Sequence, residues 1–146
     1  MRALGIDLGS KRIGVALSDS AGSMATPYEV VPRSGSRARD HGRISALADE
    51  AGAECLVVGL PLSLDGSVGQ AAQAAMDEAE QLAAATGLPV ELWDERLTTV
   101  SADHDLMALD MKAPARRRVV DKVAASIMLQ AWLDHRRLTP HEEPSR

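Results

Sequence analysis

The sequence predicts an α/β fold in which a mixed five-stranded sheet carries helices on both faces. In the first part of the chain, three short apolar segments separated by turn residues predict antiparallel strands. After residue 54, apolar segments alternate with long helical patterns, which is typical of parallel strands joined by helices. The 146 residues suit one domain, expected over 1–138, and the polar tail 139–146 is expected to be disordered.

Strands are expected over residues 3–8, 13–17, 25–31, 54–60 and 90–93. The first is apolar except for Asp7, and the turn 9–12 that follows it indicates a hairpin with the second. Residues 55–58 form an unbroken apolar run, as strands buried on both faces do.

Helical patterns and stop signals occupy most of the remaining chain. After Pro32 an Arg-, Ser- and Gly-rich segment to Asp40 indicates a mobile loop, followed by a helix that Gly52 is placed to end. An Ala-rich helix through Thr86 should end at Gly87. Ser67 is expected to cap the Ala-rich helix. Thr98 or Thr99 is expected to cap a further helix that runs to about Leu109. The last helix is expected from about Ala115 to Arg137.

The composition argues against some functions and leaves others open. A net charge of −5 is unfavourable for binding phosphates, but the basic residues are clustered, at 11–12, at 33, 37, 39 and 43, and at 116–118 with 122. Each cluster alone is explained equally well as a solvated face. No apolar run approaches the ~20 residues of a membrane span, and no secretory leader is evident, so we expect a cytoplasmic protein.

The cysteine and the histidines are not expected to carry chemistry. Cys55 is expected to be a buried core thiol in a reducing compartment. The scattered histidines are expected on the surface rather than as metal ligands or general bases; they are His41, His104, His135 and His141.

Asp7 is the first candidate site residue, because a carboxylate inside an apolar strand must be paired, protonated or bound to a cation. Its structural alternative is a strand-end Asp that accepts hydrogen bonds from the amides of Gly9 and Ser10. The sequence leaves both explanations open.

Two further acids fall where functional groups are common. Glu95 follows a short strand, although an ion pair of Asp94 or Glu95 with Arg96 explains this segment as well. Asp121 lies beside the apolar stripe of the last helix, where an ion pair with an arginine one turn earlier is an equally ordinary explanation.

Taken together, Asp7, Glu95 and Asp121 lie on three separate elements and could converge on a hard cation. Oxygen ligands favour Mg²⁺ or Mn²⁺, and no Cys and His cluster with zinc-like spacing is present. Such carboxylates can hold two ions roughly 3.5–4 Å apart for phosphodiester hydrolysis. The cations expected to contact substrate, or else to act as simple charge partners, are Lys11, Arg96, Lys122, Arg117 and Arg118.

Four segments in order resemble motifs of the YqgF/RuvX family. They are 5–16 (GIDLGSKRIGVA), 58–62 with 65–66 (VGLPL and DG), 94–99 (DERLTT) and 120–125 (VDKVAA). The resemblance covers residues 3 to about 136 and implies an RNase H-like fold, divalent metal, a cytoplasmic location and a role in ribosome biogenesis. It also implies that Asp7, Glu95 and Asp121 are the acidic site residues. The segment 32–40 and the tail after Thr139 match none of these motifs.

The expected function is therefore a metal-dependent nuclease that matures the small-subunit ribosomal RNA precursor. The main alternative is a Holliday-junction resolvase, whose two paired cuts a homodimer would supply. A non-catalytic RNA-binding assembly factor is a further alternative, although the near absence of aromatic residues argues against base stacking. A phosphotransferase or ATPase of the actin type has a similar first loop, but needs two domains to enclose its nucleotide.

Overall fold

The computed structural model describes the backbone of residues 1–98 and 113–138, and the side chains of residues 1–98 and 123–136. The helix expected from Thr98 or Thr99 to Leu109 and the tail 139–146 therefore lie outside the described residues. The side chains of Asp121, Lys122, Arg117 and Arg118 lie outside them as well.

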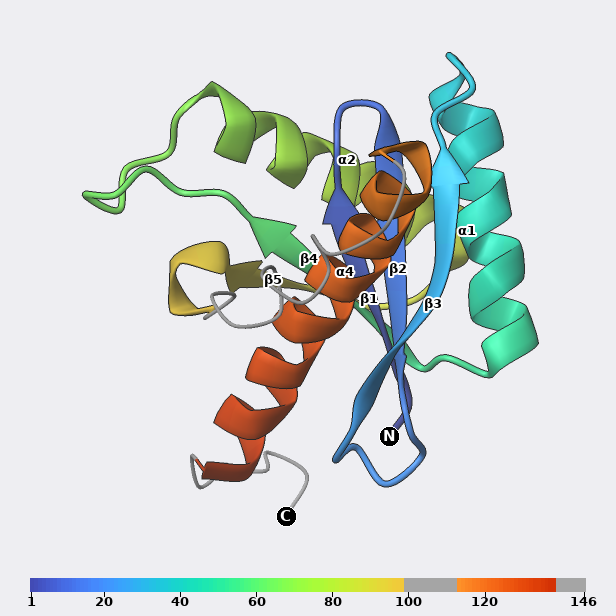
Figure 1. Ribbon diagram of the computed structural model, residues 1–146, viewed down its shortest axis with the longest axis vertical. Helices are drawn as coiled ribbons and strands as arrows, with labels where there is room; N and C mark the ends of the chain where they lie inside the picture. Colours follow the sequence, from blue (N-terminus) through green and yellow to red (C-terminus); the bar gives the residue numbers. More distant parts are fainter. Residues whose placement is uncertain (99–112, 139–146) are drawn as a thin grey trace.

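The predicted mixed sheet is present, with the strand order β3-β2-β1-β4-β5 (Figure 1). Its strands are β1 (Ala3–Leu8), β2 (Arg12–Ser18), β3 (Ala25–Pro32), β4 (Cys55–Leu60) and β5 (Val90–Asp94). The first three pair antiparallel, while β1 with β4 and β4 with β5 pair parallel, as the sequence predicts. Because β1, β4 and β5 run in one direction, their carboxyl ends lie along the same edge of the sheet.

The helices cover both faces of the sheet. Helices α1 (Arg37–Ala51) and α2 (Gln70–Thr86) contact each other on one face, and α4 (Ala113–Leu138) crosses the other (Figure 1). Strand residues alternate between two hydrophobic cores, with Leu4 facing α1 and α2 and Ala3 facing α4. The core under α4 also holds the buried rings of Trp93 and Trp132. None of the described helices is long and apolar enough to span a bilayer.

Close packing of α4 requires a small residue in the middle of β1. A Cβ built on Gly5 would lie only 2.9 Å from the Leu129 Cβ, so even alanine here would push the helix away. The same face of the neighbouring strand β2 carries the small residue Ala16, which also lets α4 lie close to the sheet. The position of α4 over β1 therefore depends on glycine in the first strand.

Gly52 and Gly87 end α1 and α2 with φ of 69° and 72°, which confirms the predicted helix ends. Other boundaries differ from the expectation. Helix α1 begins at Arg37 because Ser36 caps it, accepting a hydrogen bond from the Arg39 amide at 3.2 Å, so the loop to Asp40 is shorter than expected. Helix α4 begins at Ala113, two residues before the expected start.

The prediction that Ser67 caps the Ala-rich helix is wrong. Helix α2 begins at Gln70 and is preceded by Gly69, which makes no side-chain capping bond. Ser67 belongs instead to the preceding turn, where its amide donates to Asp65 Oδ1 at 2.9 Å. This local Asx turn satisfies the Ser67 amide before the helix starts.

Candidate active site

A pocket of about 700 Å³ opens between the carboxyl ends of the central strands and the α1–α2 layer. Its lining residues come from the ends of β1 and β4, from the segments that follow β1, β3, β4 and β5, and from both helices. They are Asp7, Leu8, Gly9, Ser10, Arg33, Gly35, Arg37, Asp40, Gly59, Pro61, Ala71, Ala74, Ala75, Glu78 and Glu95. The volume lies within the ~300–1,000 Å³ of typical ligand sites.

Two of the three predicted acids meet in this pocket. Asp7 lies near the end of β1, and Glu95 comes directly after β5, two strands away. Burial, and then the charges of Asp7 and Asp94, raise the pKa of Glu95. Asp7 and Glu95 are thus close enough for each charge to disfavour the other.

The absence of a side chain at Gly59 leaves room for the Glu95 carboxylate. Gly59 pairs with Trp93 near the end of β4, and a Cβ built on it would overlap the Glu95 carboxylate. Any larger residue would push this side chain out of its position. The close approach of Glu95 to the β4 backbone is therefore part of the geometry of the pocket.

The raised pKa of Glu95 gives a stability prediction. When a carboxyl has a higher pKa in the folded than in the unfolded protein, its ionisation lowers the stability of the folded protein. This cost is absent below the unfolded value near 4.5, increases with pH, and is complete above the raised folded pKa. We therefore expect Glu95→Gln to unfold at a higher temperature than the parent chain in EDTA at about pH 7.5, with a smaller difference near pH 4.

Thermal unfolding by circular dichroism at both pH values measures this difference. Asp65→Asn is the control, because Asp65 is exposed in a turn and its hydrogen bonds to Ser67 lower its pKa instead of raising it. A Glu95→Gln protein that loses stability at the higher pH would contradict the electrostatic explanation.

Arg96 and Lys11 were expected to contact substrate, but the structure places neither among the residues that line the pocket. Arg96 pairs with Asp94, with Nη2 and Oδ2 2.7 Å apart, and its Nη1 donates to the Leu64 carbonyl at 3.2 Å. The ion-pair alternative for this segment is thus present, with Asp94 as the partner rather than Glu95. Lys11 is exposed on the turn between β1 and β2.

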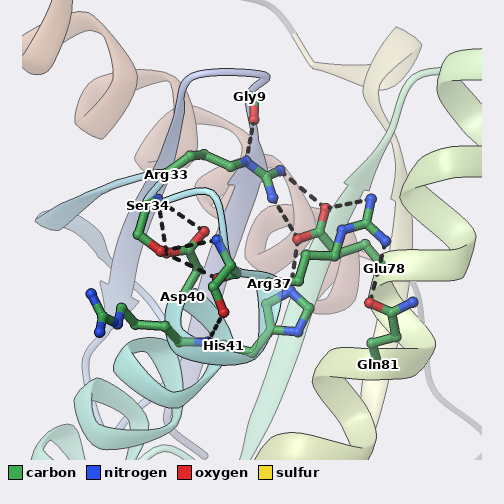
Figure 2. A network of polar contacts seen from close by, with 10 residues as sticks. Gly9, Arg33, Ser34, Arg37, Asp40, His41, Glu78 and Gln81 are labelled. Atoms are coloured by element: carbon green, nitrogen blue, oxygen red, sulfur yellow. Dashed lines mark hydrogen bonds and ion pairs between the residues drawn. The ribbon is translucent and has the colours of Figure 1, made fainter.

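The prediction that His41 is a surface residue is wrong. His41 is 3% exposed, and its Nε2 lies 2.7 Å from the Oε2 of Glu78, which is also 3% exposed (Figure 2). The two side chains face each other from α1 and α2. His135, by contrast, is exposed, as expected, and contacts the edge of the Trp93 ring.

Arg33 completes this buried network and connects it to the turn after Asp7 (Figure 2). Its Nη1 and Nη2 donate to the two carboxylate oxygens of Glu78 at 2.7 and 3.0 Å, and its Nε donates to the Gly9 carbonyl at 2.9 Å. Burial raises the pKa of Glu78, but the hydrogen bonds from Arg33 and His41 outweigh this and keep it below its usual value.

None of the sequence patterns above predicts this network, although a signal for it exists. Glu78 falls at helical spacing among the buried residues Ala75, Ala79 and Leu82 of α2, so it lies on the apolar face. An acid on such a face requires cationic partners. The sequence does not show which cations these are.

The fold is shared with a solved structure. T. thermophilus RuvC, solved in complex with a Holliday junction substrate, is similar with a TM-score of 0.58 and 18% identity, over 92% of this chain and 96% of that one. This likeness concerns the fold, which is RNase H-like: a mixed sheet with its antiparallel strands first and its parallel strands after them.

The family model described as "RuvX: Holliday junction resolvase" matches residues 1–135. A Myxococcus xanthus protein named "Putative pre-16S rRNA nuclease" is 45% identical, over 94% of this chain and 90% of its own length. One of the same name from Mycobacterium ulcerans is 49% identical, over 93% and 80%. The chain belongs to the RuvX family, and it is a nuclease, an enzyme that hydrolyses phosphodiester bonds.

Proposed function

We propose that this chain is a divalent-metal-dependent nuclease that matures the small-subunit ribosomal RNA precursor in the cytoplasm, with residues 1–138 as its single domain. Asp7, Glu95 and Asp121 are its proposed catalytic and metal-binding residues. The observation that carries the proposal is that Asp7 and Glu95, 88 positions apart in sequence, line one pocket at the carboxyl ends of the central strands. The names of the curated relatives support the RNA substrate.

The residues of the pocket suit a hard divalent cation. Carboxylate oxygens are the donors that Mg²⁺ and Mn²⁺ prefer. Burial and then the charges of Asp7 and Asp94 raise the pKa of Glu95, and a cation between Asp7 and Glu95 would offset the part that comes from Asp7. Among the described side chains, no group of three or more metal-binding residues is present. Asp121, on helix α4, is the proposed third ligand.

Bound Mg²⁺ or Mn²⁺ would lower the pKa of an attacking water and stabilise the leaving oxygen. The chain itself holds the two carboxylates in place: β1 carries Asp7, while β5 and Gly59 fix the position of Glu95. None of the described residues lining the pocket is a histidine or cysteine. The proposed mechanism uses the two carboxylates to hold the metal and takes water as the nucleophile.

Resolution of Holliday junctions is the second candidate function. The description of the family model favours it, because that description names a Holliday junction resolvase. Resolving a junction takes two paired cuts, which a twofold homodimer would supply. One active site on a monomer is enough for a precursor RNA. The substrate can therefore be tested together with the oligomeric state.

Cleavage of three nucleic acids in parallel tests the proposed function. The purified chain is incubated with a 16S precursor RNA fragment, a four-way DNA junction and a linear duplex, each in Mg²⁺, Mn²⁺ or EDTA. We expect specific cleavage of the precursor RNA with either metal and none in EDTA. Paired cuts in the junction alone would favour the resolvase, and cleavage unaffected by EDTA would contradict the metal-dependent mechanism.

A further inference from the structure

The pocket that holds Asp7 and Glu95 also has a cationic wall. Among its described lining residues, the basic ones are Arg33 and Arg37, which follow β3 and begin α1. Both belong to the segment between β3 and the first turns of α1, which matches none of the four sequence motifs. A nucleic-acid strand entering the pocket would bring further phosphates beside the scissile one, so each cation on this wall is a candidate phosphate contact.

The charge of Arg33 is already used within the protein. Two of its N–H groups bind both oxygens of Glu78, a third binds the Gly9 carbonyl, and its side chain is only 20% exposed. Glu78 and Arg33 form a buried bidentate pair that connects α2 to the β1–β2 turn. Arg33 thus holds the wall of the pocket together.

Arg37 is in a different situation, although it lies beside the same acid. Its side chain is 48% exposed, and its Nη2 forms a long ion pair with Glu78 Oε1 at 3.8 Å, beyond hydrogen-bond distance. Its Nη1 donates to the neutral Gln81 Oε1 at 3.2 Å (Figure 2). Gln81 orients the guanidinium without neutralising it, while the charge of Glu78 is balanced mainly by Arg33.

The other acid on this wall, Asp40, binds the backbone of the loop that precedes α1. Asp40 is 3% exposed, and its carboxylate accepts from the Ser34 amide at 3.1 Å. The Asp40 carboxylate is thus bonded to the loop backbone, and the exposed guanidinium of Arg37 is the accessible positive group among the described residues of the wall. A guanidinium presents a planar set of N–H donors that suits phosphate oxygens.

We propose that Arg37 binds a backbone phosphate of the substrate strand next to the cleavage site, and that Arg33, paired with Glu78, is the positioning residue for this wall. The proposal rests on the proposed nuclease function, because it places the strand in the pocket of Asp7 and Glu95. The ligand chemistry is a phosphodiester, which RNA and DNA share. Arg37 contributes to binding and leaves the chemical step to the carboxylates.

Arg37→Ala is tested against Arg39→Ala as the matched control. Arg39 has the same charge, is exposed, lies two positions further along α1 and is absent from the pocket lining. Binding of a fluorescent 16S precursor RNA fragment and of a four-way DNA junction is measured in EDTA over a range of salt concentrations. We expect Arg37→Ala to weaken binding about tenfold and to lower the salt slope by about 0.7–0.9, and Arg39→Ala to change both much less.

Kinetics in Mg²⁺ separate binding from a structural effect. Arg37→Ala should raise KM with little change in kcat, whereas a distorted pocket would lower kcat, and Arg37→Lys should restore part of the affinity. Equal effects of the Arg37 and Arg39 variants on affinity and salt slope would overturn the proposal, as would a loss of kcat with unchanged affinity. If the Arg37 effect on binding is present but the parent chain cleaves nothing, the proposed nuclease function fails and the phosphate contact stands.

Discussion

Replacing Asp7 by Asn is expected to lower the rate of Mg²⁺-dependent cleavage roughly a thousandfold. The change keeps the size of the side chain but removes the negative charge proposed to bind the metal, and metal catalysis supplies several kcal/mol of transition-state stabilisation. Asp7 lies in the pocket with Glu95 and is only partly buried, so the change should leave the sheet intact. Single-turnover cleavage of the precursor RNA fragment measures the loss.

Asp49→Asn is the matched control for this variant. Asp49 is exposed near the end of α1 and is absent from the pocket lining, and the substitution makes the same change in charge. Circular dichroism shows whether both variants keep the parent fold. Cleavage by Asp7→Asn at the parent rate would remove Asp7 from the proposed metal site, and equal losses in both variants would indicate a general charge effect.

The second large effect is expected on stability, from Glu78→Ala. This substitution leaves Arg33 without its carboxylate partner and His41 without its 2.7 Å contact, both in a largely buried site. Breaking a buried ion pair from one side costs about 3–5 kcal/mol, because the remaining charge stays buried and uncompensated. For a chain of this size the unfolding temperature should fall by about 10 °C.

Glu80→Ala provides the control, because Glu80 lies on the same helix, two positions away, and is exposed. Its effect on the free energy of unfolding should be within about 0.5 kcal/mol of zero, which is a change of about 2 °C or less in unfolding temperature. Thermal unfolding at neutral pH compares the two variants. Similar small shifts for both would show that the Arg33–Glu78–His41 network contributes little to stability.

Much of the fold was predictable from residues close together in sequence. The five strands, the hairpin at 9–12 and the helix ends at Gly52 and Gly87 each depend on a local pattern: alternation, an apolar run, or a glycine that accepts positive φ. Asp7 and Glu95 are candidates on equally local grounds, because Asp7 is an acid within an apolar strand and Glu95 directly follows a short strand. Asp121 stays a sequence prediction, since its side chain lies outside the described part of the chain.

The partners of the charged groups were decided by the tertiary structure. Arg33 and Glu78 are 45 positions apart and His41 and Glu78 are 37 apart, so no local pattern connects them. Hydrophobic periodicity identifies the face that is buried, but a charge takes the partner that packing of distant elements brings within reach. Local sequence patterns are therefore enough to predict the strands, the helices and the candidate acids, whereas the cations that line the pocket follow from how distant elements pack.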